Sequence, residues 1–195
     1  MSRITRRTLH RGLLAAGGTL LAALVSRKFL LPAADAQQDV PPPPFQGLDA
    51  LKTHSPTPLP PLSFVDGTGA SRTLDQYKGH GLVLNLWATW CVPCVTELPA
   101  LDALARTLQP SGAQVLTVSV DRGGADQVRP FFAAHGIRSL PILLDPHSAV
   151  LSTLKLDGIP TTLLVNRNGL EVARLQGPID WSAPATLALV NRLLA

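Results

Sequence analysis

The sequence predicts an α/β domain built on one mixed β-sheet over residues 59–195. Two apolar runs of strand length, at residues 82–89 and 113–120, are each followed by a segment with helical spacing. A hairpin pattern and a last amphipathic helix complete the chain. Near-continuous apolar strands are typical of a sheet that is covered on both faces, so we expect flanking helices on both sides.

The elements of this domain follow in order. Residues 62–79 read as two short strands around a turn at Asp66-Gly67, followed by one helical turn. Residues 91–109 form a helix, with apolar side chains at helical spacing: Val95, Leu98, Leu101, Leu104 and Leu108. The remaining elements are a helix closed by Gly136, a short strand, a short helix, a hairpin turning at Asn168-Gly169 and a final helix, at residues 124–136, 139–145, 148–156, 161–177 and 182–195.

The formal net charge of +4 is concentrated at the N-terminus. Residues 1–36 hold six of the 17 Lys and Arg side chains but only one of the 13 Asp and Glu side chains. The rest of the chain therefore carries 11 basic and 12 acidic side chains, a net charge of −1. A domain so close to neutral has no overall electrostatic footprint for nucleic acid.

Residues 1–36 have the pattern of an N-terminal export signal. A basic start precedes a 14-residue apolar run, Gly12–Val25, and Ala34-Asp35-Ala36 fits a cleavage site. Because about 20 apolar residues are needed to span a bilayer, a cleaved signal is favoured over a retained inner-membrane anchor. Residues 5–9 (TRRTL) leave the twin-arginine and ordinary Sec routes equally open. Both routes lead to an oxidising compartment, which we expect to be the periplasm.

A proline-rich segment follows this signal. Residues 37–61 contain eight prolines in 25 residues, a composition that favours extended backbone and forms no packed core. We therefore expect a linker over residues 37–58 and the folded domain over residues 59–195.

The only two cysteines, Cys91 and Cys94, follow an apolar strand and begin a helix. Three uses are open: a structural disulfide, a metal site and a redox couple. A disulfide across two residues closes a very small loop and so adds little stability. Zinc needs about four ligands, and the five histidines are scattered. Haem attachment needs histidine after the second cysteine, where this chain has Val95.

The position of the pair favours the redox couple. Free backbone N–H groups and the helix dipole stabilise a thiolate at a helix N-terminus, where we place Cys91. Pro93 is tolerated in the first turn, because that turn needs no N–H there. Cys94 lies one turn further along and is placed to resolve a mixed disulfide formed by Cys91.

Beyond this argument, the motif WATWCVPC resembles the active site of thioredoxin. Further segments resemble the TlpA/ResA-type exported thiol-disulfide oxidoreductases of the same superfamily, namely CVTELP, VSVDRGG, GIPTTLLVNRNG and GPIDW. The resemblance covers residues 59–195. It implies a thioredoxin-like fold, with a central mixed β-sheet flanked by helices on both faces, and a redox-active disulfide that needs no cofactor or metal.

The resemblance also implies substrate-binding residues. Pro160 matches a cis-proline that faces the disulfide, although a plain strand-edge proline would suit the position as well. A cis bond there would turn the backbone of Ile159 outward, able to pair with an extended client segment. Trp90 is expected to cap the exposed side of the dithiol, and Pro93 to contact substrate. Pro99 matches a proline that kinks the active-site helix.

Glu97 is the expected catalytic carboxylate. In the resemblance it lies beside the cysteines and tunes proton transfer, whereas the alternative is a solvated acid favoured by the helix dipole. Thioredoxins carry a buried aspartate where this chain has Asn85, and asparagine cannot act as a base. Glu97 is therefore expected to deprotonate Cys94. Trp87 is expected in the core, and Trp181 as a packing anchor for the last helix.

These features predict a periplasmic protein-disulfide reductase. Val92-Pro93 places no histidine between the cysteines to stabilise the thiolate, which favours a reducing dithiol. The resemblance implies a membrane thiol-electron transporter as the source of electrons. Its clients would be exported proteins with paired cysteines, of the cytochrome c type or the cytochrome oxidase and copper-assembly type. No nucleic-acid partner is expected, and membrane contact only if residues 1–36 are retained.

A second function from another class uses the same residues. Cys91 and Cys94 are soft ligands that would suit a copper metallochaperone. Copper carriers of this fold add a spaced histidine and widen the cysteine spacing, and Pro160 would crowd a metal. The sequence therefore favours the reductase.

Overall fold

The computed structural model describes residues 45–194, so the expected export signal and the first part of the linker lie outside the described residues. The domain is one eight-stranded mixed sheet in the order β1-β8-β7-β4-β5-β6-β2-β3. The strands are β1 (Lys52–Pro58), β2 (Ser63–Asp66), β3 (Ser71–Thr73), β4 (Leu82–Trp87), β5 (Gln114–Ser119), β6 (Leu143–Leu144), β7 (Thr161–Val165) and β8 (Leu170–Gln176). The helices are α1 (Val92–Leu108), α2 (Gly124–Ala134), α3 (Ala149–Thr153) and α4 (Pro184–Leu194), with short 3-10 turns at Leu48–Ala50, Leu74–Tyr77 and Gln109–Ser111.

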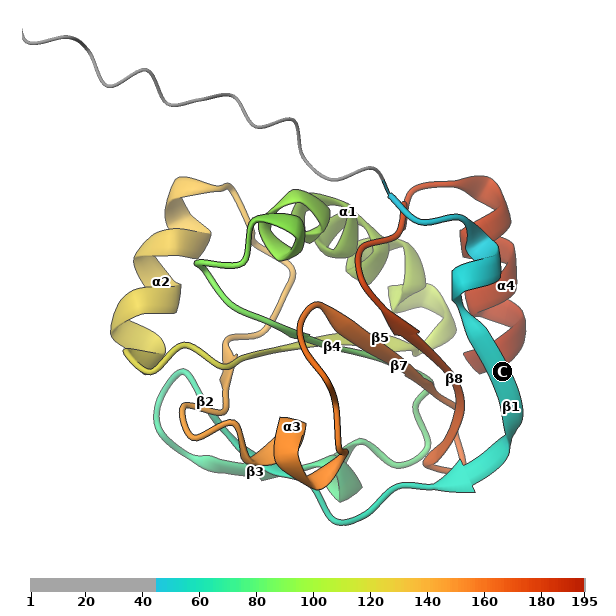
Figure 1. Ribbon diagram of the computed structural model, residues 1–195, viewed down its shortest axis with the longest axis horizontal. Coiled ribbons are helices and arrows are strands. Elements are labelled where there is room, and N and C mark those ends of the chain that lie inside the picture. Colours follow the sequence, from blue (N-terminus) through green and yellow to red (C-terminus); the bar gives the residue numbers. More distant parts are fainter. Residues whose placement is uncertain (1–44, 195) are drawn as a thin grey trace, which may run out of the picture. The chain divides into compact units, whose positions relative to one another are not determined.

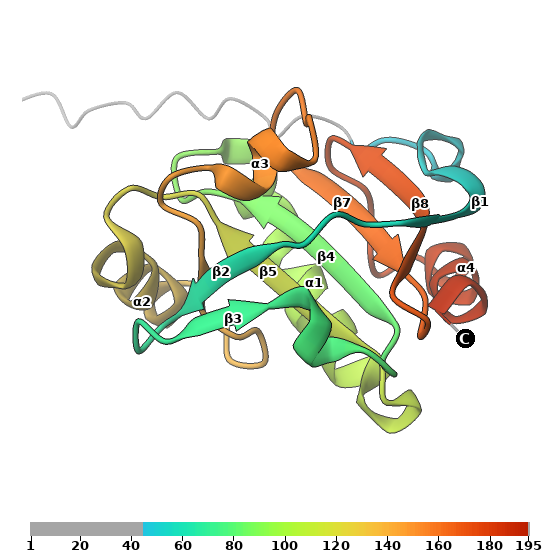
Figure 2. The ribbon, with the colours of Figure 1, turned by 90° about the horizontal axis from the view of Figure 1, so that it is seen from below.

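Helices cover both faces of the sheet, as the sequence predicts (Figure 1). The larger cluster of buried side chains joins α1, α2 and α4 to one face. The second cluster joins α3 and β2 to the other face. The turned view shows α3 and β2 on that side (Figure 2). Successive side chains of a strand point to opposite faces, so β4 contributes to both clusters and all six of its residues are buried. The expected α/β architecture, a mixed sheet with helices on both faces, is confirmed.

The centre of the sheet brings the functional segments together. β4 pairs in parallel with β5 and antiparallel with β7. In the second pairing Leu86 lies opposite Thr161, so the residues just before β7 lie beside the end of β4. The chain leaves β4 there and enters α1 a few residues later. The register alone therefore places residues 158–160 close to the cysteine pair.

The start of the domain corrects the expected linker boundary. Residues 52–58, which we expected to belong to the linker, form the edge strand β1 and pair antiparallel with β8. Pro56 and Pro58 lack an N–H, but an edge strand tolerates this because one side of it has no partner strand. Ahead of β1, the side chain of Leu51 is buried in the larger core cluster. The folded domain therefore begins before residue 59.

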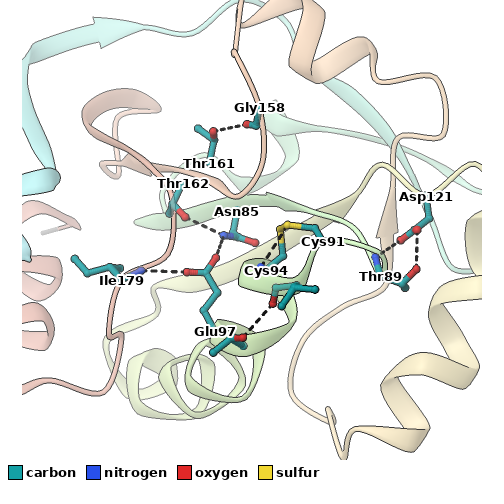
Figure 3. Close-up of a disulfide and its surroundings, with 12 residues drawn as sticks. Asn85, Thr89, Cys91, Cys94, Glu97, Asp121, Gly158, Thr161, Thr162 and Ile179 are labelled. Carbon is teal, nitrogen blue, oxygen red and sulfur yellow. Dashed lines mark hydrogen bonds between the residues drawn. A yellow bond between two sulfur atoms is a disulfide. The ribbon is translucent and has the colours of Figure 1, made fainter. Parts of the chain in front are cut away.

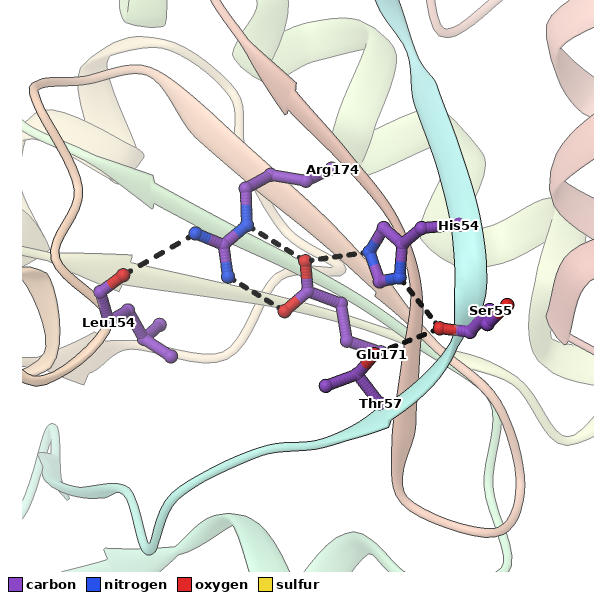
Figure 4. Close-up of polar contacts among 6 residues, drawn as sticks. All are labelled: His54, Ser55, Thr57, Leu154, Glu171 and Arg174. Carbon is purple, nitrogen blue, oxygen red and sulfur yellow. Dashed lines mark hydrogen bonds and ion pairs between the residues drawn. The ribbon is translucent and has the colours of Figure 1, made fainter.

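A polar cluster holds β1 against β8 (Figure 4). Glu171 on β8 accepts two hydrogen bonds from Arg174, at 2.8 and 2.7 Å, and lies 3.2 Å from Nε2 of His54 on β1. Glu171 is nearly fully buried, and its carboxylate raises the pKa of Arg174. Removing the segment that contains Leu51 and β1 would therefore delete a buried leucine side chain and uncover the carboxylate of Glu171.

This arrangement predicts that a chain beginning at residue 59 is less stable than one beginning at residue 45. Burying a leucine side chain such as Leu51 contributes about 1.5–3 kcal/mol, and the lost strand pairing adds to this. We expect the unfolding free energy, measured in urea, to fall by about 2 kcal/mol or more. Equal stability of the two chains would show that residues 45–58 are only a linker.

Candidate functional site

Cys91 and Cys94 form a disulfide at the N-terminus of α1, with their Cα atoms 5.3 Å apart (Figure 3). Cys91 is the N-cap residue, and its Sγ accepts a hydrogen bond from the Cys94 backbone N–H at 3.4 Å. The 17-residue helix directs its positive dipole end toward this sulfur. Cys91 keeps 6% of its surface exposed, whereas Cys94 is fully buried. A sulfur from outside the protein can therefore reach Cys91 but not Cys94.

The surface around Cys91 is apolar and exposed. Trp90 is 66% exposed and Val92 is 59% exposed, values that are unusual for large apolar side chains. Beside them lies a hollow lined by Trp90 and Ile159, with the exposed cation Arg122 among its other residues. The predicted cis peptide bond between Ile159 and Pro160 is present. The structure thus brings Trp90 and Ile159 to one hollow, whereas Pro93, in the first turn of α1, does not line it.

Glu97 lies behind the disulfide and is fully buried, which excludes the solvated first-turn acid. Its carboxylate accepts hydrogen bonds from Asn85 Nδ2 at 2.9 Å, Trp181 Nε1 at 3.0 Å and the Ile179 backbone N–H at 3.4 Å. Burial raises the pKa of Glu97 to about 7, although the three donors favour the charged form. This carboxyl group can therefore gain or lose a proton near neutral pH.

Two partners of Glu97 have roles that the sequence reasoning missed. Trp181 is buried in the larger core cluster, as expected, but its indole N–H also binds Glu97. Asn85 donates both amide hydrogens, one to Glu97 and one to Thr162 Oγ1 at 2.9 Å. A polar residue within an apolar strand needs a buried partner, and this was the available signal for Asn85. Trp87 is fully buried, as predicted.

A second buried carboxylate fixes the segment that leads into Cys91. Asp121, two residues after the end of β5, accepts hydrogen bonds from the Thr89 backbone N–H at 2.9 Å and the Thr89 hydroxyl at 2.8 Å (Figure 3). The hydroxyl of Ser119 and the amide of Gln127 also donate to it. Asp121 is fully buried, so these donors replace its lost hydration. The VSVDRGG segment therefore holds the entry to the active-site helix in place.

No group of three or more His, Cys, Asp and Glu side chains is arranged to hold a metal within residues 45–194. None of the helices in that part of the chain is both long and apolar enough to cross a bilayer.

Comparison with known proteins identifies the family. The profile of the AhpC/TSA family matches residues 56–172. The thiol-disulfide oxidoreductase ResA of Bacillus subtilis is 30% identical over 140 residues, which cover 71% of this chain and 75% of that protein. The chain is a ResA-type member of the AhpC/TSA family.

One further relative and one solved structure can be compared with this ResA-type chain. ResA of Geobacillus thermodenitrificans is 34% identical over 110 residues, 56% of this chain, and the match spans 62% of the length of that relative. A secreted thiol-disulfide isomerase of Corynebacterium glutamicum has the same fold, with a TM-score of 0.62 and 19% identity. That structural match covers 77% of the ResA-type chain and 94% of the isomerase.

Proposed function

We propose that the protein is an exported protein-disulfide reductase that exchanges the Cys91–Cys94 dithiol with disulfides of client proteins. The observation that carries this proposal is the partly exposed Cys91 at the N-terminus of α1, with the buried Cys94 behind it and exposed apolar side chains around it. Helix N-termini lower the pKa of a thiol and so supply the attacking thiolate. The relatives named as thiol-disulfide oxidoreductases support the same chemistry.

The reaction has two exchange steps. The Cys91 thiolate attacks one sulfur of a client disulfide, and the other client sulfur leaves as a thiolate that takes up a proton. Cys94 then loses its proton and attacks Cys91 Sγ, which forms the Cys91–Cys94 disulfide and releases the second client sulfur. The client gains two electrons and the protein loses two. Glu97 accepts the proton of Cys94, because its pKa near 7 suits a base at neutral pH.

The client would bind along the hollow between Trp90 and Ile159. Among the described residues, no backbone hydrogen bond engages Ile159, which lies just outside β7. Its free N–H and C=O are available to an extended client segment that carries the reacting cysteine. Trp90 and Val92 would cover the apolar side chains of that segment. Pro93 is then a substrate contact only for a client that reaches over the top of α1.

The export pattern of residues 1–36 supports a periplasmic location. In an oxidising compartment the dithiol must be regenerated, so we propose a membrane thiol-electron transporter as its reductant. Clients would be exported proteins with paired cysteines, such as apocytochrome c or proteins that assemble copper and cytochrome oxidase. The sequence features that suggest these clients lie in the cis-proline segment and in GPIDW.

The reduction potential tests the direction of the reaction. Val92 and Pro93 provide no charged group to stabilise the reduced dithiol. We therefore expect a potential near the roughly −270 mV of a reducing dithiol, rather than the roughly −120 mV of a strong oxidant. Equilibration with defined dithiol–disulfide buffers, followed by trapping of the free thiols, measures it. A value near that of the strong oxidant would show that the protein inserts disulfides instead.

A further inference from the structure

Asn85 has a buried acceptor atom for which the disulfide form offers no donor. The side chain is fully buried, and its Oδ1 is one of three buried side-chain atoms without a hydrogen-bond partner among the described residues; the others are Trp87 Nε1 and Thr117 Oγ1. An unpaired buried polar group destabilises the state that contains it. Such an atom beside a redox centre suggests that a partner appears in the other redox state.

The orientation of the Asn85 amide is fixed by its neighbours. Both hydrogens of Nδ2 are used, by Glu97 Oε1 and by Thr162 Oγ1, each at 2.9 Å. A carboxylate oxygen only accepts hydrogen bonds, so the ionised Glu97 requires the nitrogen, and not the oxygen, on its side. Oδ1 must therefore point away from Glu97.

Asn85 and Cys94 share one side of the sheet. Side chains alternate along β4, so Asn85 lies on the same face as Val83 and Trp87, which join Cys94 in the larger core cluster. Cys94 and Glu97 are three residues apart on α1 and so lie on one side of that helix. Figure 3 shows Asn85 between Glu97 and the cysteine pair, with the amide oxygen on the side of the sulfurs.

We propose that Asn85 Oδ1 accepts a hydrogen bond from the Cys94 thiol in the reduced protein and thereby sets the balance between dithiol and disulfide. This inference rests on the proposed function. It assigns a role to Asn85, which stands at the position of the buried aspartate in thioredoxins. When a dithiol reductant supplies two electrons, the Cys91–Cys94 bond breaks, Cys94 takes a proton and the reductant becomes a disulfide. The new S–H is a buried donor on the same face of the sheet as the unpaired oxygen, which Figure 3 shows turned toward the sulfurs.

The expected consequence is a stabilised reduced state. The hydrogen bond exists only when Cys94 carries a proton, so it raises the pKa of Cys94 and favours the dithiol. Cys94 is then held as a thiol until the resolution step, in which this hydrogen bond must break before the proton leaves. Asn85 is thus an acceptor for the reacting thiol and not a base.

Replacing Asn85 by leucine tests the inference through the equilibrium between the dithiol and the disulfide. Asn85→Leu keeps the size of the side chain but removes the acceptor, so the ratio of reduced to oxidised protein should fall about tenfold in the same dithiol–disulfide buffer, which is about 30 mV. Thr117→Val is the matched control, because it removes another unpartnered buried polar atom from the neighbouring strand. The control should leave the ratio unchanged. An unchanged or increased ratio in Asn85→Leu overturns the proposal.

A direct signal comes from a chain whose only thiol is Cys94. In Cys91→Ser, the infrared S–H stretch of Cys94 should lie at the lower frequency of a hydrogen-bonded thiol. Adding Asn85→Leu should raise this frequency, whereas adding Thr162→Val, which removes a partner of the amide nitrogen only, should not. The same frequency in all three chains contradicts the hydrogen bond.

The unsubstituted protein provides a third measurement if Asn85→Leu does not fold. The carboxamide ¹³C resonance of Asn85 should move on reduction with dithiothreitol, and that of the exposed Asn168 should not. No movement at Asn85 would overturn the proposal. These three measurements need only a small dithiol and no client protein. If the protein failed to reduce any client, the proposed function would be wrong, but the results on Asn85 would still stand.

Discussion

Replacing Cys94 by serine is expected to leave the protein covalently joined to its clients. Cys91 keeps its small exposed surface and its place at the helix N-terminus, so it still attacks a client disulfide. Serine cannot attack the mixed disulfide, so the second step is lost and catalytic turnover is abolished. The joined species should appear on non-reducing gels of extracts from the compartment to which the protein is exported, and should disappear when an external thiol is added.

Cys91→Ser is the matched control for this experiment. It also leaves one thiol, but Cys94 is fully buried on the core-facing side of α1 and so should join few clients or none. If Cys91→Ser accumulated joined clients and Cys94→Ser did not, the roles of attacker and resolver would be reversed. If neither variant accumulated them, the protein would not act on protein disulfides in that compartment.

Replacing Glu97 by glutamine is expected to change how stability depends on pH. The folded protein raises the pKa of Glu97 from its ordinary value of 4.5 to about 7, so it binds this proton more tightly than the unfolded chain does. The stabilisation is fully present below pH 4.5 and is lost as the pH rises through about 7. Ionisation of the buried carboxyl therefore costs about 3 kcal/mol of unfolding free energy above that range.

Urea unfolding of the oxidised protein between pH 4.5 and 8.5 measures this effect. Wild-type stability should fall across the range, and Glu97→Gln should lose most of that slope, because glutamine does not ionise. Asp126→Asn removes an exposed acid from α2 and should keep the wild-type slope. In client turnover, the wild-type rate should rise through pH 7 and the rate of Glu97→Gln should not. Parallel stability profiles for wild type and Glu97→Gln would disprove the raised pKa.

Strands and helices with strong apolar patterns were predictable from the sequence. β4 is a continuous apolar run because both of its faces are covered, and α1 repeats apolar side chains at helical spacing. β1 was not predictable, since all seven of its residues are exposed and two are prolines. Its place in the sheet depends on pairing with β8, more than 100 residues further along the chain.

The candidate site also has a part that was predictable from the sequence and a part that was not. The cysteine pair was visible because its chemistry depends on local spacing and on the helix that follows. The partners of Glu97 were not, because Trp181 and Ile179 are 84 and 82 residues away and only the folded chain brings them together. Burial of Glu97 follows from the same long-range contacts. The sequence therefore suggested a carboxylate beside the dithiol without predicting its raised pKa.

The two edges of the sheet limit strand pairing between two copies of this protein. At one edge β1 carries Pro56 and Pro58, and at the other edge β3 has only three residues. Neither edge offers a long row of free N–H groups to a strand from another molecule, so the usual route to edge-to-edge aggregation is blocked. An extended cysteine-bearing chain would thus find free backbone mainly at Ile159, next to the sulfur that reacts with it. Sheet edges that cannot pair with another strand thereby limit self-association and leave the segment beside Cys91 as the main place for an extended chain to bind.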